Sequence, residues 1–260
     1  MPAAAAGEAG AIWEVGCATG SLISPMPILP ITDADRVFIL TGAGISAESG
    51  IPTFRDAGGL WRNYRIEEVA SPRAWKRDPR LVWDFYSMRR KVASEAKPNP
   101  GHYALAALEK ALQDRLFLCT QNVDNLHEQA GAERVFHMHG ELFKSRCDTC
   151  SRPPFADCSV HESPGEIPRC ACGGQIRPHI CWFGETPFHL EEIFRALRDC
   201  SVFIAIGTSG SVEPAASFAA QVAGRAKTYY VGPEAPVNQA SFDECLLGKA
   251  GELLPGLFSC

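Results

Sequence analysis

The sequence predicts an α/β fold in which a mainly parallel sheet carries helices on both faces. Short apolar runs suited to buried strands recur along the chain, and helical patterns separate several of them. The first of these runs ends at once in a glycine turn. Strands that alternate with helices imply right-handed crossovers and a parallel sheet. With 260 residues, the chain can form one large domain with a smaller one inserted in it.

The strands of the sheet are expected at five apolar runs, residues 37–40, 116–119, 134–138, 202–206 and 228–231. Helical patterns occur at residues 103–113, 190–199 and 215–223. These elements assign residues 31–56, 101–140 and 186–260 to the large domain.

The first strand leads into Gly42-Ala43-Gly44, which small polar residues follow. Such a turn presents bare backbone N–H groups to a pyrophosphate at a helix N-terminus, so the large domain is expected to be Rossmann-like and to bind a dinucleotide. The usual fingerprint has a third glycine where this chain has Ala47, and the segment continues into Pro52-Thr53-Phe54-Arg55-Asp56. An ordinary dehydrogenase loop does not need that continuation.

Two stretches interrupt the alternation of strands and helices and are expected to form a small domain. Residues 57–100, which include Trp75, Trp83, Phe85 and Tyr86, are expected to form a helical insertion. Residues 141–185 carry most of the clustered cysteines and show little periodicity. We expect something other than a hydrophobic core to hold this second insertion.

Four cysteines of the second insertion form two close pairs, Cys147 with Cys150 and Cys170 with Cys172, separated by 19 residues. This spacing is near that of a zinc ribbon, and four thiolates close the coordination shell, so the expected Zn²⁺ is structural. Cys158 competes for a ligand position but lacks a paired neighbour. The alternative is four free thiols in a loop.

Composition limits the possible function and location. Lys and Arg total 25 against 30 Asp and Glu, whereas contacts to nucleic-acid phosphates need a basic excess. No apolar run approaches a membrane span. Residues 1–30 contain no Lys or Arg, so neither a signal nor a transit peptide is expected, and the eleven cysteines favour a reducing compartment. We expect a cytoplasmic monomer with a poorly ordered tail over residues 1–30, and no binding to nucleic acid or membrane.

Polar side chains follow two of the expected strands. Gln121, Asn122 and Asp124 come after one strand, and His137 and His139 come at the end of the next. Ligands of open α/β sheets bind at the carboxyl ends of the strands. A histidine there is well placed to act as a base near neutral pH, although either His is equally compatible with a structural role.

Taken together, the motifs resemble those of the sirtuin family, the NAD-dependent protein lysine deacylases. They occur in the family's order from about residue 37 onward, in the segments 42–46, 50–55, 121–124, 139–140, the four cysteines, 182–185 and 207–209. The resemblance implies that NAD is a co-substrate, that acyl-lysine proteins or peptides are the other substrate, and that the acyl group passes to ADP-ribose.

The resemblance also implies roles for individual residues. His139 would be the general base, and Asn122 would orient the ribose and a water. Phe183, Gly184 and Glu185 would bind the substrate peptide as an added strand. The NAD contacts would come from Gly42, Ala43, Gly44, Ile45, Glu48, Phe54, Arg55, Gln121, Asn122, Asp124, Gly207, Thr208, Ser209 and Ala250.

One position departs from the family pattern. Gly232 stands where sirtuins usually have Asn. A side-chain contact to the adenosine ribose is therefore not carried over to this chain.

Two residues of the helical insertion bear on the acyl group. Tyr86 and Arg89 stand three apart, so on a helix they project from one face. A guanidinium in an apolar acyl pocket costs several kcal/mol unless an anion pairs with it. The pair resembles the signature of sirtuins that remove succinyl, malonyl and glutaryl groups. The alternatives are that Tyr86 packs while Arg89 and Arg90 are solvated, or that Arg90 takes the role of Arg89.

Four rival functions remain open from the sequence. An ADP-ribosyltransferase would use the same NAD motifs, and a plain deacetylase would lack the acidic-acyl preference. A zinc-ribbon interaction module would use the α/β half only as a scaffold. An ordinary Rossmann oxidoreductase would transfer a hydride and produce reduced nicotinamide, whereas a sirtuin releases free nicotinamide.

Overall fold

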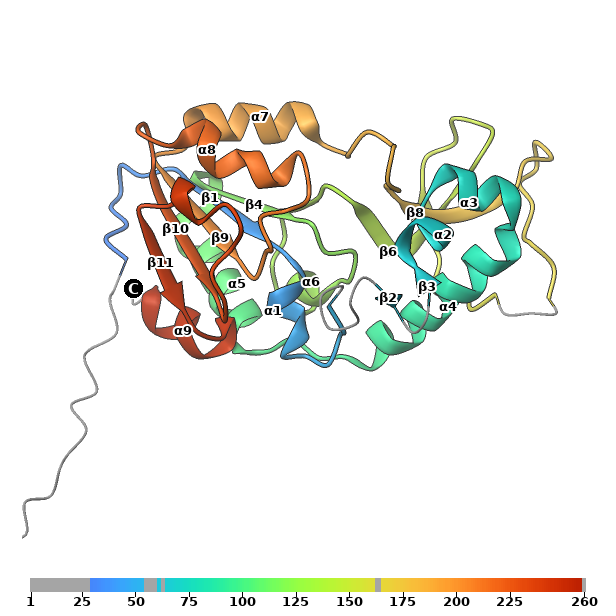
Figure 1. Cartoon of the computed structure of the whole chain (residues 1–260), viewed down its shortest axis with the longest axis horizontal. Coiled ribbons are helices and arrows are strands. Elements are labelled where there is room, and N and C mark those ends of the chain that lie inside the picture. The colour runs from blue at the N-terminus through green and yellow to red at the C-terminus, as the bar shows by residue number, and fades with distance from the viewer. Residues whose placement is uncertain (1–28, 54–59, 62–63, 162–164, 259–260) are drawn as a thin grey trace, which may run out of the picture.

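Six parallel strands form the sheet of the large domain in the computed structural model, which describes residues 29–53, 60–61, 64–161 and 165–258 (Figure 1). The strands, in their order across the sheet, are β11 (Glu244–Leu247), β10 (Lys227–Gly232), β9 (Val202–Ile206), β1 (Val37–Thr41), β4 (Leu116–Thr120) and β5 (Val135–His137). The α/β class and all five expected strands are confirmed. The sequence did not predict β11, because this edge strand is half-exposed and lacks a continuous apolar run.

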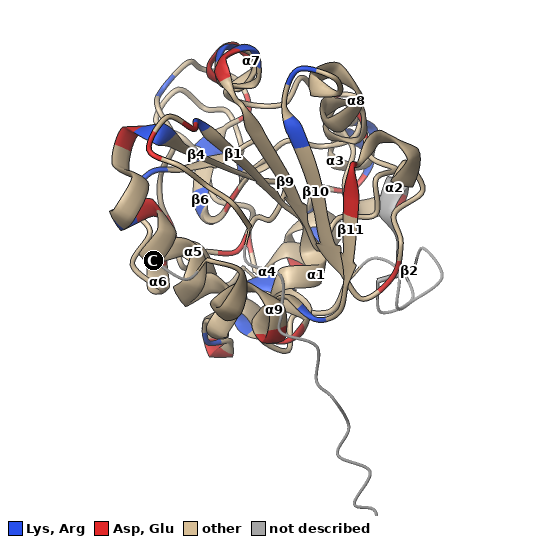
Figure 2. Ribbon diagram, turned by 90° about the vertical axis from the view of Figure 1, so that its left-hand side faces the viewer, with Lys and Arg blue, Asp and Glu red and all other residues tan. Residues whose placement is uncertain are grey.

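Helices cover both faces of this sheet, as predicted (Figure 2). In β1, Val37 and Ile39 belong to the core that includes α5 (Pro100–Leu112) and α9 (Ala250–Leu257). Phe38 and Leu40 point the other way, into the core that includes α7 (Leu190–Asp199) and α8 (Phe218–Val222). Because successive strand residues face opposite sides, a strand buried on both faces is a continuous apolar run.

The helix ends differ from the expected ones where capping decides them. Helix α5 begins three residues early, because the Asn99 side chain accepts from the Gly101 N–H and Pro100 stands at the first position. The helix expected over residues 215–223 is a 3-10 turn, η2 (Ala215–Ser217), followed by α8. Four short elements complete the large domain: α1 (Ala43–Ala47), η1 (Gln113–Arg115), α6 (Leu126–Gln129) and η3 (Gln239–Ser241). No helix of the described residues is long and apolar enough to cross a membrane.

The strand order reverses between β1 and β9. From β1 the chain builds β4 and β5 on one side, and it then returns to build β9, β10 and β11 on the other. In open α/β sheets the ligand crevice lies at the carboxyl ends of the strands beside this switch point. The loops after β1 and β9 meet there: the Gly42 N–H donates to Ile206 O at 2.9 Å, and the Gly44 N–H donates to Gly207 O at 2.8 Å.

The small domain combines both insertions (Figure 1). A three-stranded antiparallel sheet, β7 (Phe155–Ala156), β6 (Gly140–Cys147) and β8 (Ile176–Ile180), packs with α2 (Ile66–Val69), α3 (Pro72–Arg77) and α4 (Pro79–Glu95). A short hairpin pairs β2 (Leu60–Trp61) with β3 (Tyr64–Arg65).

The expectation that the cysteine-containing insertion lacks a core is wrong. Trp83 and Phe85 of α4 share one buried cluster with Leu142 of β6 and with Ile176 and Ile180 of β8. The contributing segments are far apart in sequence, so neither insertion shows this core by itself.

Candidate functional site

The glycine turn packs directly against the loop after β9. A Cβ atom added at Gly44 would lie 2.7 Å from the Gly207 Cα, and one at Gly42 would lie 2.9 Å from the Gly207 carbonyl oxygen. No side chain fits at either position without moving backbone. The close backbone approach fits the glycine turn of a dinucleotide site. The expectation of bare N–H groups is wrong for Gly42 and Gly44, because these two groups donate to Ile206 O and Gly207 O.

Asn122 is tied to this turn by its side chain. Its Nδ2 group donates to Gly42 O at 3.1 Å and to Ser46 Oγ at 3.0 Å. Both amide hydrogens are therefore used within the protein, which leaves the side-chain oxygen to accept from a hydroxyl or a water. Ser46 was not among the predicted site residues, although it is the small polar residue two positions after Gly44.

Asp124 is buried beside this turn. Its carboxylate accepts from the Leu126 N–H at 3.2 Å, and it also hydrogen-bonds Ser46. Burial raises the pKa of Asp124, and the hydrogen bonds and the nearby Arg89 charge only partly counter this effect. A buried carboxyl group of this kind favours an amide donor as its ligand.

His139 has a defined tautomer. Its Nδ1 lies 3.1 Å from the Gln121 carbonyl oxygen, and because a carbonyl can only accept, Nδ1 carries the hydrogen. Nε2 of the neutral ring is then an acceptor. Burial lowers the pKa of His139, and the bond to Gln121 only partly offsets this, so the ring is a neutral base at physiological pH.

His137 differs from His139 because both of its ring nitrogens have partners. Nδ1 lies 3.0 Å from the Asn122 carbonyl oxygen, and Nε2 lies 2.7 Å from a Glu128 carboxylate oxygen. Burial lowers the pKa of His137, but the bond to Glu128 and its charge outweigh burial and give a net rise. Both nitrogens are committed, so His137 positions the Asn122 backbone.

The loop after β9 is held from two sides. Gln121 Nε2 donates to Thr208 Oγ1 at 3.1 Å, and Tyr230 Oη donates to the Thr208 carbonyl at 3.2 Å. A Cβ atom at Gly232 would lie 2.3 Å from this Tyr230 oxygen. The departure at Gly232 therefore has a steric reason, since the Tyr230 ring occupies the space that a side chain would need.

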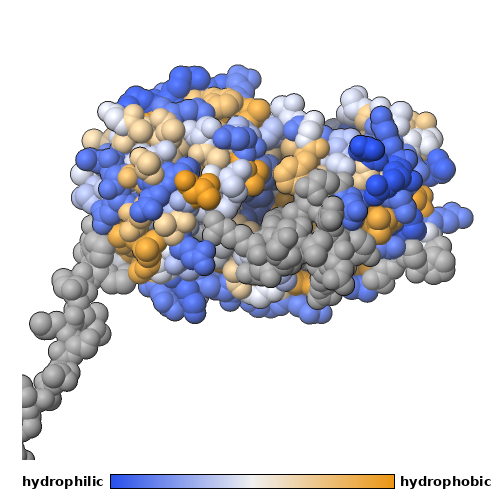
Figure 3. Space-filling view, viewed as in Figure 1, coloured by the Kyte–Doolittle hydropathy of each residue, from blue (hydrophilic) through white to orange (hydrophobic). Residues whose placement is uncertain are grey.

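The remaining expected cofactor positions lie around the glycine turn. The Glu48 carboxylate accepts from the Gly251 N–H at 3.1 Å beside buried Ala250, and Ile45 O accepts from Asn99 at 2.7 Å. Phe54 and Arg55 lie outside the described residues. The surface is hollowed between the two domains (Figure 3).

The four predicted metal ligands converge. The sulfur atoms of Cys147, Cys150, Cys170 and Cys172 all lie within 4.8 Å of one another, with Cys147 to Cys172 at 3.5 Å and Cys150 to Cys170 at 3.8 Å. A tetrahedron with Zn–S bonds of about 2.3 Å has sulfur atoms about 3.8 Å apart, so the cluster fits Zn²⁺. Cys158 is exposed and not part of this group.

Helix α4 brings the expected acyl-pocket residues together. Tyr86 is 1% exposed, and Arg89 is half-buried with its guanidinium carbon 5.7 Å from the Tyr86 ring centroid. Burial lowers the pKa of Arg89, while the neighbouring Tyr86 and Asp124 oppose that shift. Arg89, an expected acyl-pocket residue, and Asp124, an expected NAD contact, are thus electrostatic neighbours.

Arg90 lies outside the expected acyl pocket, because its side chain is bound to other parts of the small domain. It is 1% exposed and donates to Leu142 O, Lys144 O, Ser145 Oγ, Ser159 O and a carboxylate oxygen of Asp157. All three guanidinium nitrogens are used on the β6 side of the helix. The alternative that Arg90 replaces Arg89 is therefore wrong.

In the expected peptide-binding turn, Phe183 is exposed, whereas the carboxylate of Glu185 is bound within the protein. Phe183 is 54% exposed, and Gly184 has a φ of +91°, which favours glycine. The Glu185 carboxylate is instead bound by Arg177, at 2.7 and 3.0 Å, and by the Trp182 N–H at 2.8 Å. Glu185 shapes the turn and does not present its carboxylate to a peptide.

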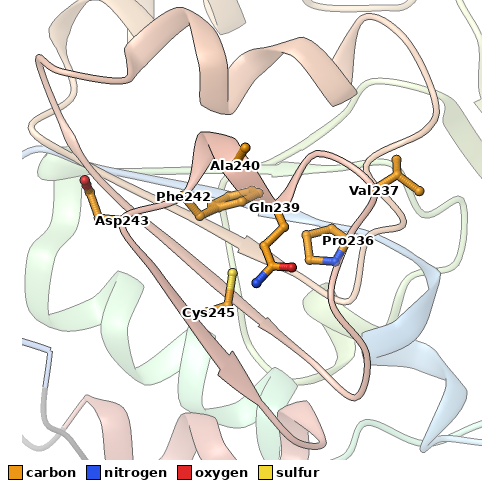
Figure 4. Close-up of a pocket in the computed structure, with 7 residues that line it drawn as sticks. All are labelled: Pro236, Val237, Gln239, Ala240, Phe242, Asp243 and Cys245. Carbon is orange, nitrogen blue, oxygen red and sulfur yellow. The ribbon is translucent and has the colours of Figure 1, made fainter.

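A separate pocket of about 670 Å³ lies along the β10 to β11 connection (Figure 4). Its lining residues are Pro236, Val237, Gln239, Ala240, Phe242, Asp243 and Cys245. They include none of the expected site residues, so this pocket has no part in the site.

The chain is similar to known proteins over most of its length. A model described as the Sir2 family matches residues 42–214. An NAD-dependent protein deacylase of Pasteurella multocida is 47% identical over 234 residues, which cover 86% of this chain and 97% of the relative. An NAD-dependent protein deacylase of Leishmania major is 49% identical over 228 residues, which cover 84% and 92%.

Solved structures show the same similarity. A Sir2 homolog–NAD complex aligns with a TM-score of 0.79 and 41% identity, covering 86% of this chain and 89% of that one. A Sir2 structure with a deacetylated p53 peptide and 3′-O-acetyl ADP-ribose aligns with a TM-score of 0.75 and 28% identity, covering 86% and 93%.

Proposed function

The chain belongs to the Sir2 family, and we propose that it is an NAD-dependent protein deacylase that removes acyl groups from lysine side chains. The observation that carries the proposal is the grouping of an accepting imidazole, an oriented amide and a glycine turn at the switch point of the sheet. When bound, NAD supplies a glycosidic bond whose cleavage releases nicotinamide and leaves ADP-ribose as the acyl acceptor.

His139 is the general base in this proposal. Its Nδ1–H bond to Gln121 O fixes the ring, and the lone pair on Nε2 can take a proton from a ribose hydroxyl. Asn122 accepts from that hydroxyl or from a water through its side-chain oxygen. The glycine turn holds the phosphates, and Asp124 accepts from the amide of nicotinamide.

The zinc cluster supports the site from a distance. Four thiolates would close the coordination shell of Zn²⁺ and leave no position for a substrate. The ion would therefore stabilise the small domain, which carries α4 and the peptide-binding turn.

The acyl group favoured by the site is acidic, with succinyl, malonyl and glutaryl as the candidates. Tyr86 and Arg89 lie together on α4, and Asp124 lies within electrostatic reach of Arg89. A substrate carboxylate would bind the guanidinium group of Arg89 through two hydrogen bonds. This contact would further compensate for the free-energy cost of burying the Arg89 charge. Burial raises the pKa of Tyr86, so its hydroxyl stays protonated and can donate to the same carboxylate.

Removal of the base tests the first part of the proposal. We expect His139→Ala to lower the deacylation rate by roughly 10²-fold to 10⁴-fold, because a positioned base contributes that much. Binding of ADP-ribose, measured by calorimetry, should be retained. A variant that still transfers acyl groups at the wild-type rate would refute the assignment of His139.

Peptides with different acyl groups test the second part. We expect Arg89→Met to lower kcat/KM for succinyl-lysine peptide and to leave acetyl-lysine turnover nearly unchanged. Lys91→Met is the matched control, because it removes one positive charge from the exposed side of the same helix. Succinyl turnover that survives Arg89→Met would reject the acidic-acyl preference and leave the deacylase proposal intact.

A further inference from the structure

Trp182 contacts the acyl-pocket tyrosine through its indole nitrogen. Trp182 Nε1 lies 3.1 Å from Tyr86 Oη, and the two side chains are 2% and 1% exposed. An indole N–H can only donate, so the Tyr86 oxygen is the acceptor in this bond. Arg89, which also has only donors, hydrogen-bonds the same side chain. With both donors on its oxygen, the hydroxyl hydrogen of Tyr86 must point away from them.

Trp182 is itself held rigidly from the peptide-binding turn. The Arg177 guanidinium carbon lies 3.2 Å from the centre of the Trp182 ring, and Arg177 also binds both carboxylate oxygens of Glu185. Glu185 accepts from the backbone N–H of Trp182 at 2.8 Å. Ring and backbone of Trp182 are therefore fixed by one ion pair, which fixes the direction of its indole N–H.

We infer that Trp182 is a positioning residue for acyl selection, which orients the Tyr86 hydroxyl as a hydrogen-bond donor to the carboxylate of an acidic acyl group. The inference rests on the proposed acidic-acyl preference and adds a residue outside the pocket pair to it. It also links the peptide-binding turn to the acyl pocket, because the Arg177–Glu185 pair that shapes the turn also holds the indole.

Substitution of Trp182 by Phe removes the N–H and keeps an aromatic ring. We expect the ratio of kcat/KM for succinyl-lysine to that for acetyl-lysine to fall about 3-fold to 10-fold, the range for loss of one neutral hydrogen bond. Acetyl-lysine has no carboxylate at this position, so its turnover should change much less. A structural role alone would lower both substrates together.

A double-mutant cycle with Tyr86→Phe shows whether Trp182 acts through the hydroxyl. Tyr86→Phe should lower the same ratio, and adding Trp182→Phe to it should cause no further fall. Trp75→Phe is the matched control. Its ring lies 5.8 Å from that of Trp182, but its indole N–H donates to Asp148, so the ratio should stay at the wild-type value.

The outcomes separate this inference from the function it rests on. If Tyr86→Phe and Arg89→Met both leave the ratio unchanged, the acidic-acyl preference is refuted, and the role of Trp182 with it. If those variants lower the ratio but Trp182→Phe does not, or if its effect persists unchanged in the Tyr86→Phe background, only the role of Trp182 is refuted. Should Trp182→Phe fail to fold, replacement of Trp182 by its benzothiophene analogue removes the N–H with the ring shape kept, and the same ratio decides.

Discussion

Two adjacent arginines of α4 are expected to contribute very different amounts to stability. Arg90 donates five hydrogen bonds, at 2.6 to 3.2 Å, to groups of β6 and of the segment after β7, and it pairs with Asp157 at 3.1 Å. Its guanidinium carbon also lies 5.1 Å from the Trp83 ring centroid. Replacing it by Met removes the arginine counter-ion of the Asp157 carboxylate, whose side chain is 9% exposed. Loss of one partner of a buried ion pair costs about 3–5 kcal/mol of stability.

Urea unfolding of the zinc-loaded protein measures this cost. We expect Arg90→Met to lower the free energy of unfolding by about 3–5 kcal/mol. Arg90→Lys should be intermediate, since a single ammonium group cannot reach all five acceptors. Arg89→Met should cost about 1 kcal/mol or less, because Arg89 is only half-buried. Equal losses for the two Met variants, or a loss below about 1 kcal/mol for Arg90→Met, would refute the assignment of the two arginines.

Three further results are expected. Because the pKa of His139 lies below 6.5 and the neutral ring is the base, kcat/KM should fall with acidification around a midpoint below pH 6.5; a midpoint above 6.5 would contradict this. Removal of zinc by a chelator should unfold the small domain, since four-cysteine sites contribute on the order of 10 kcal/mol to folding. If metal analysis shows that zinc is gone and the circular dichroism spectrum is unchanged, this prediction is wrong. Gly44→Ala should weaken ADP-ribose binding at least 10-fold in calorimetry, because the new Cβ would force the glycine turn away from Gly207. An unaltered affinity would show that the turn does not hold the phosphates.

The sequence predicted the large-domain sheet well for a physical reason. Strands such as β1 and β9 are buried on both faces, so each is an uninterrupted apolar run between turn residues. The edge strand β11 is half-exposed and has no such run. The core of the small domain comes from segments about 60 to 100 residues apart, as Trp83 and Leu142 or Ile176 show, and no local pattern reports a contact over that distance.

The same limit applies to individual site residues. Short motifs at strand ends predicted the neighbourhood of Asn122, Asp124 and His139, because parallel strands bring their carboxyl ends to one edge. The sequence could not separate Arg89 from Arg90, since adjacent helix residues project about 100° apart and only the packing of α4 shows which side faces β6. Nor could it show that Glu185, in the turn after β8, is bound by Arg177 of that strand.

The most direct test of the account is the product balance of a reaction with NAD and an acyl-lysine peptide, followed by mass spectrometry. We expect one nicotinamide and one O-acyl-ADP-ribose for each peptide that loses its acyl group, with succinyl peptide consumed in preference to acetyl peptide. Attachment of ADP-ribose to a peptide that keeps its acyl group, or deacylation without consumption of NAD, would contradict the account.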